Sequence, residues 1–413
     1  MGSGSAAMDG AWPGPAPASG DYRLLWQGPP PATGFVAPFR GRIYQVVQRM
    51  SPTSAQALVA YDADSGVELW HLPVAANFTF AVTSTGVVAG IPDSFGGQSS
   101  PAAGGSVWDF HVVLLDLETG QPIWRSAETY QLNSQPFGAA TQIAGDSVLF
   151  IDGQLTLVAL DLATGRERWR VESSTPPPAR CNCPGVGPAI AGDNVYFDNP
   201  VTGQIVAVSL SSGEQTWAVD DPVERTTAPQ GGAIITGAIA LGATDQGVIV
   251  NTWWLPSGTS TGTFGLLSAS DGSPIWSWGT DKPVQDFARV GDAVIVITRS
   301  PGETDWHLER VDLATGKVLE RSEQTFKDAF YLRLLYLPES DLLLVSTPET
   351  NELVGVNPET LAVRWTAPVI ADCRIIFPVL PNGNLACRTQ TGLAVYQPAT
   401  AQNEPATPVG SSR

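Results

Sequence analysis

The stretch Val158–Trp169, which reads VALDLATGRERW, decides the fold. Its apolar beginning predicts a β-strand that is buried on both faces. In the segment that follows, Asp161 can accept backbone N–H groups and Gly165 can adopt the positive φ of a tight turn. The next strand carries Trp169, which is large enough to fill the wedge between two radial sheets and whose indole N–H needs a partner.

The same phrase recurs along the chain at the spacing of a β-propeller. Its Gly-equivalent positions are 66, 120, 165, 213, 272, 316, 361 and 401, with gaps of 54, 45, 48, 59, 44, 45 and 40 residues. Each gap fits one four-stranded antiparallel blade, so we predict an all-β, eight-bladed propeller. The residues predicted to lie between blades are Trp70, Trp124, Trp169, Trp217, Trp276 and Trp365. Glu320 replaces the tryptophan of the sixth copy, and Leu361 replaces the glycine of the seventh.

The two ends of the chain are predicted to share one blade. The eighth copy begins at Val395 but ends without its tryptophan. The segment Tyr22–Trp26 resembles an outer strand that has no repeat phrase before it. We therefore predict that this segment completes the last blade beside Leu393–Gln397, with Trp26 as a further interblade residue.

The rest of the domain organisation follows from composition. We predict one propeller domain over residues 22–400, and we interpret residues 1–8 as a cloning scar, 9–21 as a flexible Pro/Gly linker and 401–413 as a disordered tail. A linker at this point suggests a lipoprotein signal or membrane anchor upstream, and hence an extracytoplasmic protein, periplasmic or at the cell surface. The sequence has no run of 18 apolar residues, so we expect no membrane insertion by this segment.

Charge and cysteine content narrow the function classes. The net charge of −18 repels phosphate backbones, so nucleic acid is not an expected partner. The four cysteines fit an oxidising compartment without demanding one. We expect local pairing of Cys181 with Cys183 and of Cys373 with Cys387. Cys183 and Cys373 take equivalent positions in blades that face each other across the ring. A disulfide cannot join Cα atoms more than about 7 Å apart, so eight blades exclude a bond between these two cysteines.

The phrase at Val158–Trp169 closely resembles the tryptophan-docking repeat of the pyrroloquinoline-quinone (PQQ) dehydrogenases. The resemblance covers about residues 22–400 and implies the propeller fold. The same repeat builds noncatalytic relatives, which include the outer-membrane assembly lipoprotein BamB and the sensor domains of some bacterial kinases. Because fold does not fix function, the resemblance leaves both catalytic and noncatalytic roles open.

The catalytic role would need a quinone site. The family's enzymes hold a metal-bound quinone on the propeller axis with acidic and amide ligands, and several have a disulfide between adjacent cysteines. Here Cys181 and Cys183 are not adjacent, and no Asp or Glu matches a ligand motif of the family. We interpret His71, His111 and His307 as strand-end residues and not as ligands. We therefore expect no catalytic residue, no metal and no cofactor, and a PQQ-dependent dehydrogenase remains the alternative.

The favoured role is that of a protein-binding scaffold or sensor. In a propeller, the connections between the second and third strands share a face with the connections between blades. Several of these are long, namely Arg49–Gln56, Ile91–Asp109, Trp253–Phe264 and Ser300–Trp306. Aromatic residues in or beside them are candidate partner contacts, namely Phe95, Trp108, Trp253, Trp254 and Trp306. A small-molecule or glycan sensor that uses the axial funnel is a further alternative.

Overall fold

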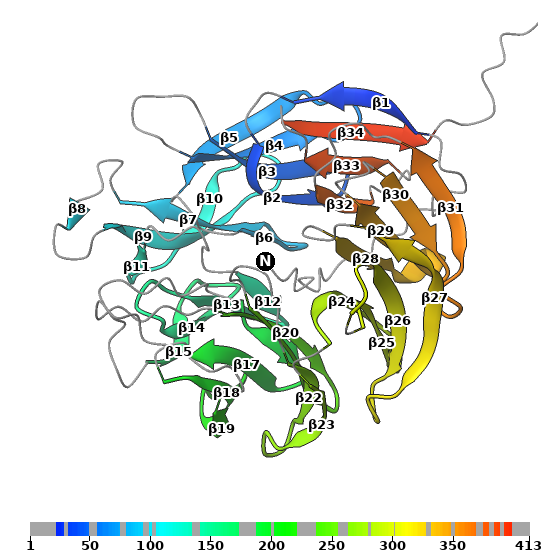
Figure 1. Ribbon diagram of the computed structural model, residues 1–413. Coiled ribbons are helices and arrows are strands. Elements are labelled where there is room, and N and C mark those ends of the chain that lie inside the picture. Colours follow the sequence, from blue (N-terminus) through cyan, green and yellow to red (C-terminus); the bar gives the residue numbers. More distant parts are fainter. Residues whose placement is uncertain are drawn as a thin grey trace, which may run out of the picture.

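The chain forms eight antiparallel sheets arranged around a central axis in a computed structural model (Figure 1), and we number these sheets as blades 1–8. The prediction of an eight-bladed, all-β propeller is confirmed. The structure describes residues 22–28, 32–48, 56–74, 80–93, 99–100, 105–133, 141–172, 187–199, 202–220, 237–254, 263–279, 282–300, 302–327, 332–347, 352–368, 375–379, 384–388 and 392–398. The segments interpreted as a scar, a linker and a tail lie outside these residues.

Blades 1 to 4 follow one another in chain order. Blade 1 consists of β2 (Ala32–Phe39), β3 (Arg42–Gln48), β4 (Gln56–Asp62) and β5 (Glu68–Val74). Blade 2 consists of β6 (Ala81–Val82), β7 (Val87–Pro92), β9 (Gly105–Leu115) and β10 (Pro122–Arg125), with β8 (Ser99–Ser100) and β11 (Tyr130–Asn133) also paired to β9. Blade 3 consists of β12 (Gln142–Ala144), β13 (Ser147–Ile151), β14 (Leu157–Asp161) and β15 (Glu167–Val171). Blade 4 consists of β16 (Ala189–Ala191), β17 (Asn194–Asn199), β18 (Gln204–Ser209) and β19 (Gln215–Asp220).

Blades 5 to 8 complete the ring. Blade 5 consists of β20 (Gly237–Thr244), β21 (Gly247–Trp254), β22 (Phe264–Ser268) and β23 (Pro274–Trp278). Blade 6 consists of β24 (Val284–Val290), β25 (Ala293–Thr298), β26 (Trp306–Asp312) and β27 (Val318–Phe326). Blade 7 consists of β28 (Arg333–Leu337), β29 (Leu342–Thr347), β30 (Glu352–Val356) and β31 (Val363–Pro368), with a short 3-10 helix η1 (Pro338–Ser340). Blade 8 consists of β32 (Ile375–Val379), β33 (Leu385–Arg388), β34 (Leu393–Pro398) and β1 (Tyr22–Gln27).

The ring closes through the two ends of the described chain, as predicted. Strand β1 pairs with β34, so that Leu24 lies opposite Tyr396 and Trp26 opposite Val395. Figure 1 shows β1 as the outermost strand of blade 8, beside β34. The indole N–H of Trp26 donates to the carbonyl of Ala63 in blade 1, at 2.9 Å. The N-terminal strand therefore belongs to the last blade and docks onto the first.

The core lies between the blades as well as within them. The middle strands β13 and β14 are buried along almost their whole length, which explains their unbroken apolar sequence. One cluster joins Val148 and Phe150 of blade 3 to Val88 and Phe110 of blade 2. Each blade is thus stabilised by side chains that its neighbours supply.

The repeat phrase folds as the sequence predicts. A carboxylate oxygen of Asp161 accepts the backbone N–H and the hydroxyl of Thr164, at 2.9 and 2.7 Å. Gly165 follows with φ of 68°. Asp62, Asp116 and Asp312 bind the Ser or Thr three residues ahead in the same way.

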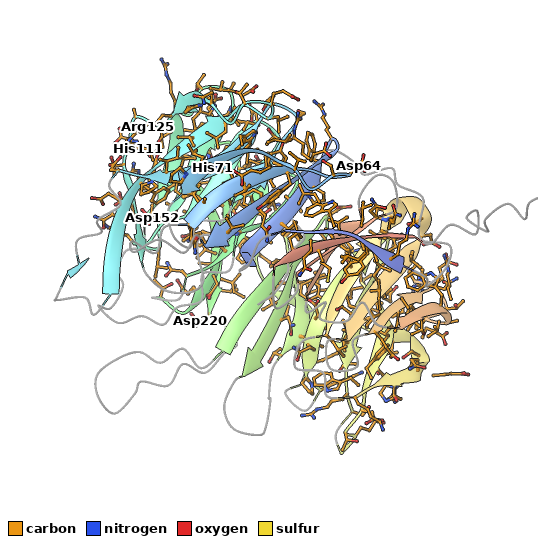
Figure 2. The ribbon with its side chains drawn as sticks, turned by 90° about the horizontal axis from the view of Figure 1, so that it is seen from above. Asp64, His71, His111, Arg125, Asp152 and Asp220 are labelled. Carbon is orange, nitrogen blue, oxygen red and sulfur yellow. The ribbon has the colours of Figure 1, made fainter. Side chains whose placement is uncertain are left out.

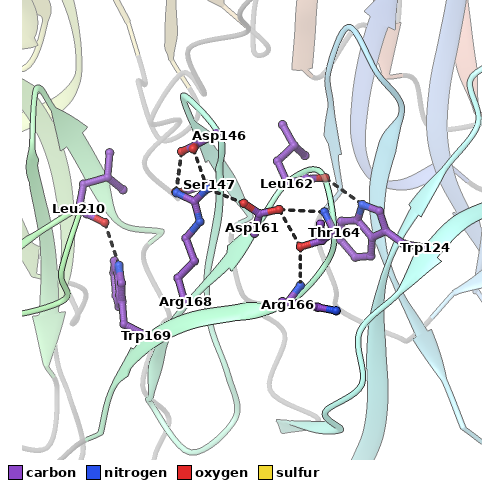
Figure 3. A network of polar contacts seen from close by, with 10 residues as sticks. All are labelled: Trp124, Asp146, Ser147, Asp161, Leu162, Thr164, Arg166, Arg168, Trp169 and Leu210. Atoms are coloured by element: carbon purple, nitrogen blue, oxygen red, sulfur yellow. Dashed lines mark hydrogen bonds and ion pairs between the residues drawn. The ribbon is translucent and has the colours of Figure 1, made fainter.

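The tryptophans join consecutive blades. In six of them, the indole N–H donates to the carbonyl three residues before the phrase glycine of the next blade (Figure 3). The ring of each of these six packs on that glycine. Trp124 donates to Leu162 and Trp169 to Leu210, both at 2.8 Å. The same bond is made by Trp26, Trp70, Trp217 and Trp276. Trp169 and Trp217 are buried, whereas Trp26, Trp70, Trp124, Trp276 and Trp365 are partly buried.

A β-bulge precedes each of these docking residues, and sequence reasoning missed it. Trp169 lies opposite Ala159 and Glu167 opposite Leu160, which leaves Arg168 as the extra residue. The register shifts at the equivalent place in all eight outer strands. The bulged residues are Leu25, Leu69, Ile123, Arg168, Thr216, Ile275, Leu319 and Arg364. A bulge turns the strand locally, and here it brings the tryptophan toward the next blade.

The two departures from the repeat meet at a single joint. A Cβ added at Gly165 would lie 2.4 Å from the Trp124 ring, so a side chain there and a docked tryptophan exclude each other. Blade 6 has Glu320 in place of the tryptophan, and the turn that should receive it, in blade 7, has Leu361 in place of glycine. Leu361 has φ of 56° and is 2% exposed. The leucine therefore occupies the space that the missing ring leaves.

This pairing predicts strong coupling between the two positions. We expect Glu320→Trp alone to destabilise the protein because the ring meets Leu361, and Leu361→Gly alone to destabilise it by opening a cavity. Together they should restore the common joint, with a favourable coupling energy of about 1–3 kcal/mol. Urea unfolding of the four proteins measures this energy. Additive effects would show that the two positions are independent.

Candidate functional site: the long-loop face

One face of the disc carries the longest connections. Because the strands of a blade alternate in direction, the connections between second and third strands share a face with those between blades. We call this the long-loop face, and we call the opposite face, with the Asp-to-Gly turns, the turn face. The chain leaves residues 49–55, 93–104, 255–263 and 299–305 between second and third strands in blades 1, 2, 5 and 6. The corresponding stretches in blades 3 and 4 are only 152–156 and 200–203.

The aromatic candidates do not all lie as expected. Phe95 lies outside the described residues. Trp253 and Trp254 are the last residues of β21, paired with Ala238 and Gly237. Trp108 belongs to β9, opposite Leu132, and does not lie in a loop. The expected loop Ile91–Asp109 is therefore partly strand, since β9 begins at Gly105 and pairs there with β8.

Trp306 requires a correction. It begins β26, is 8% exposed, and belongs to a core cluster with Phe326 and Leu332. The guanidinium of Arg299 lies 5.1 Å from its ring centroid. Trp306 folds down onto its own blade because its ring completes the packing between blades 6 and 7. It is not available as a partner contact.

Polar side chains cluster at the long-loop end of blade 2. Asp93 follows β7 and lies 2.6 Å from Arg125 and 3.2 Å from Nε2 of His111. Nδ1 of His111 donates to the Ser126 carbonyl, at 2.8 Å. The hydroxyl of Ser126 accepts the Val112 N–H and donates to the Glu128 carbonyl. Ser126 is thus fully engaged in the backbone, so the group is structural and offers no free nucleophile. Figure 2 labels His111 and Arg125.

A second charged cluster lies at the same end of blade 6. Glu303 lies 2.6 Å from Arg321 and 3.3 Å from Nε2 of His307. The Ser300 backbone N–H and then Arg321 hold the pKa of Glu303 below its usual range. The side chain of Glu309 is 5% exposed, and its charge is offset by Lys282 at 2.6 Å. The ammonium of Lys282 also lies 4.0 Å from the centroid of the Trp278 ring.

The short connection of blade 3 carries a perturbed carboxyl. Asp152 accepts backbone N–H groups from Gln154 and Thr156, at 2.9 and 3.0 Å. Burial nevertheless raises the pKa of Asp152 to about 6. Figure 2 labels this residue. In the folded protein it therefore binds a proton at a pH where the unfolded chain has already lost it.

This shift predicts the sign of a pH effect. Between the ordinary Asp pKa of about 4 and the folded pKa of about 6, the folded state binds more protons, so stability falls as pH rises through that window. Asp152→Asn keeps the acceptor oxygen and should flatten this slope, and it should raise stability relative to the parent at pH 7. Asp161→Asn is the matched control, because Arg168 holds the pKa of Asp161 below its usual range and its loss should destabilise at pH 7. Urea midpoints at pH 4.5 and pH 7 measure both effects, and an unchanged slope in Asp152→Asn would contradict this account.

The cysteines are only partly described. Cys387 lies in β33, opposite Ile376, is fully buried, and forms a disulfide. Cys181, Cys183 and Cys373 lie outside the described residues. Pairing of Cys373 with Cys387 and of Cys181 with Cys183 therefore stays a prediction.

The described residues do not fit a metal-bound quinone. Among them, no three His, Cys, Asp or Glu side chains come together in a way that could hold a metal ion. Asp286, an acidic residue of an inner strand, is 4% exposed and accepts the Leu334 N–H at 2.9 Å. It is committed to the joint between blades 6 and 7. We therefore derive no reaction step through a quinone. Within the same part of the chain, no helix is long and apolar enough to span a membrane.

The chain is similar to known proteins of one family. A family model described as outer membrane protein assembly factor BamB matches residues 108–251 and 203–376, well over half of the chain. The chain belongs to this family of PQQ-like β-propellers. Another member, the outer membrane protein assembly factor BamB of Burkholderia pseudomallei, is 25% identical over 277 residues, 64% of this chain. That match spans 60% of the length of the relative.

Solved structures share the fold of the family. BamB from Moraxella catarrhalis has a TM-score of 0.56 at 14% identity, over 91% of this chain and 100% of that one. A quinohemoprotein alcohol dehydrogenase from Pseudomonas putida HK5 has a TM-score of 0.54 at 13% identity, over 95% of this chain and 78% of that one. An assembly factor and an enzyme are thus nearly equal in structural likeness. At these identities the likeness concerns the fold alone.

Proposed function

We propose that this chain is a noncatalytic, extracytoplasmic propeller that binds a protein partner through its long-loop face. The observation that carries the proposal is the concentration of long connections on one face, in blades 1, 2, 5 and 6, on a closed ring. Loops held by a rigid scaffold are common contact surfaces. The relatives named as outer membrane protein assembly factors support a partner of the same kind, a protein engaged in assembling the outer membrane.

The electrostatics of this face support a polar contact surface. Two of its described ion pairs are partly exposed, with Arg125 53% and Asp93 37% exposed in blade 2 and Arg321 39% and Glu303 38% exposed in blade 6. Such pairs contribute little to folding stability, so they remain available to adjust to a partner. Trp253 and Trp254, at the edge of the connection in blade 5, are the aromatic residues that we propose as contacts. Phe95 and Trp108 are proposed contacts from blade 2.

Site-specific photo-crosslinking in the native envelope tests the proposal. Thr304 lies in the β25–β26 connection on the long-loop face, and Ala163 lies in the β14–β15 turn of blade 3 on the turn face. Both are exposed. We expect a photoreactive residue at 304 to capture a defined protein and one at 163 to leave it uncaptured. Capture from 163 alone would place the contact on the wrong face.

The alternative of a quinoprotein dehydrogenase has its own test. We expect PQQ with calcium to give no quinone absorption shift and no oxidation of alcohols or aldoses with an artificial electron acceptor. The reason is that the described residues lack a metal-binding group and Asp286 is committed to backbone. A stoichiometric PQQ complex with turnover would overturn the noncatalytic proposal.

A further inference from the structure

The ring divides into two halves, blades 1–4 and blades 5–8, and the polar clusters of blades 2 and 6 match one another. In blade 2, His111 and Arg125 contact the carboxylate of Asp93, and Ser126 binds the backbone beside them. In blade 6, His307 and Arg321 contact the carboxylate of Glu303, and Ser322 binds the backbone beside them. Each pair is separated by 196 residues. Ser322 accepts the Leu308 N–H and donates to the Gln324 carbonyl, as Ser126 does with Val112 and Glu128. The clusters differ at Nδ1 of the histidine, which has a partner in His111 but none among the described residues in His307.

The next pair of blades repeats the match. In blade 3 the bulged Arg168 pairs with Asp146 of the first hairpin, at 2.6 Å (Figure 3). In blade 7 the bulged Arg364 pairs with Asp341 of the first hairpin, at 3.6 Å. The two arginines are again 196 residues apart. The halves therefore agree in surface detail that the common blade repeat does not require.

Six of the eight exposed large apolar side chains among the described residues lie in blades 1, 2, 5 and 6, whereas Leu24 lies in blade 8 and Val363 in blade 7. Among the described residues, the bulged positions of blades 1, 2, 5 and 6 carry Leu69, Ile123, Ile275 and Leu319, which are 43, 53, 42 and 49% exposed. Val67 in blade 1 and Val318 in blade 6 add to them, at 59 and 43%. Blade 8 has the partly buried Leu25 at the bulge, but blades 3, 4 and 7 have Arg168, Thr216 and Arg364, so folding does not demand an apolar residue there. Exposed apolar groups that the fold does not need indicate a contact surface.

These residues form two sectors of the outer rim near the turn face. The first sector is Val67, Leu69 and Ile123, on blades 1 and 2, and the second is Ile275, Val318 and Leu319, on blades 5 and 6. Trp70 binds the Leu117 carbonyl and Trp276 the Leu313 carbonyl, so each sector spans a joint closed by a tryptophan. The two sectors lie on opposite sides of the ring, because they are four blades apart (Figure 1).

The charge of the two sectors indicates the charge of the partner segment that would bind them. From the phrase Asp to the docking residue, residues 62–70 and 116–124 carry five acidic and no basic side chains. Arg42 of β3 pairs with Glu118, so the first sector keeps a net acidic charge that is smaller than this count. The equivalent stretches of the second sector, 268–276 and 312–320, carry three acidic side chains and one lysine. The stretches of blades 3 and 7 are neutral, with two of each sign in 161–169 and one of each in 357–365, and that of blade 4, 209–217, carries one acidic side chain. Both sectors therefore favour a partner segment that is apolar and basic.

The bulges indicate the backbone conformation of the partner segment. Each outer strand pairs on one side only, which would ordinarily invite an added strand. The bulge at every docking residue interrupts that edge at the apolar position itself. A segment whose backbone hydrogen bonds are already satisfied, an amphipathic helix, fits such an edge better than an extended one.

We propose that the rim carries two equivalent docking sites, one on each sector, for a basic amphipathic helix of a partner protein. The propeller then holds two copies of that helix, on opposite sides of the ring. This surface is separate from the long-loop face, so the proposal stands or falls independently of the face proposed above.

Calorimetric titration with a synthetic helix tests the stoichiometry. The probe is a peptide of leucine and lysine with leucines at i, i+3, i+4 and i+7, at physiological ionic strength. We expect saturation at two peptides per propeller. Leu69→Ser with Ile123→Ser should leave one site, Ile275→Ser with Leu319→Ser should leave one site, and all four together should leave none.

Matched controls separate docking from nonspecific attraction. Leu24→Ser with Val363→Ser removes exposed apolar side chains outside both sectors and should leave two sites. A scrambled peptide of the same composition should not saturate at two. The proposal would be overturned if the parent protein saturated at one peptide, or if a sector variant still bound two. Equal binding of the scrambled peptide would also overturn it. Because the changed residues are exposed, unfolding midpoints should stay those of the parent.

Discussion

Deleting residues 22–27 is expected to destabilise the entire propeller by at least about 3–5 kcal/mol, the cost of losing one interblade tryptophan. The deletion removes β1, which leaves β34 with an open edge. It also removes the Trp26 ring that packs on Gly66 and the hydrogen bond to Ala63. Leu25 and Trp26 pack against a cluster that includes Ile43, Tyr61 and Val395, so both blades of the joint lose contacts.

Urea unfolding measures the effect, with the variant Arg23→Ala as the control. Arg23 lies in the same strand but is exposed, so its loss should leave the unfolding midpoint nearly unchanged. A deletion protein as stable as the parent would show that the ring does not depend on its N-terminal strand. A separate early transition would show that blade 8 unfolds by itself.

The second large effect is expected at Trp169. Trp169→Ala should cost about 3–5 kcal/mol, because it opens a cavity between blades 3 and 4 and leaves the Leu210 carbonyl without its indole partner. Trp169→Phe keeps a ring over Gly213 but removes the N–H, so it should cost distinctly less. Chemical denaturation of the two variants separates packing from hydrogen bonding. Equal losses would mean that the hydrogen bond, and not the ring, holds the joint.

The sequence predicts the ring well because its signal is local and repeated. Asp, Gly and Trp lie within nine residues of one another, and each has a single physical task at a turn or a joint. Closure followed from the same logic, since an eighth phrase lacked a tryptophan that Trp26 could supply. The bulge at Arg168 was missed because it depends on the register of two strands, which residue types alone do not specify.

The candidate site was harder to predict, for reasons that individual residues show. Trp306 was expected to be a contact because it adjoins a long connection, but its ring packs into the core. The exchange of tryptophan for Glu320 could not be explained before its neighbour across the joint, Leu361, was known. The division into halves did have a sequence signal. Residues 110–120 read FHVVLLDLETG and residues 306–316 read WHLERVDLATG, with His, Asp, Thr and Gly in register.

The central claim is that a protein partner binds the long-loop face. Its most direct measurement is the Kd of the protein captured from position 304 for three forms of the propeller. Trp253→Ser with Trp254→Ser is expected to weaken binding about tenfold or more, as the loss of a contact hot spot does. Ala163→Lys, on the turn face of blade 3, is expected to leave the Kd unchanged. Unchanged affinity in the tryptophan variant together with a loss in Ala163→Lys would contradict the claim.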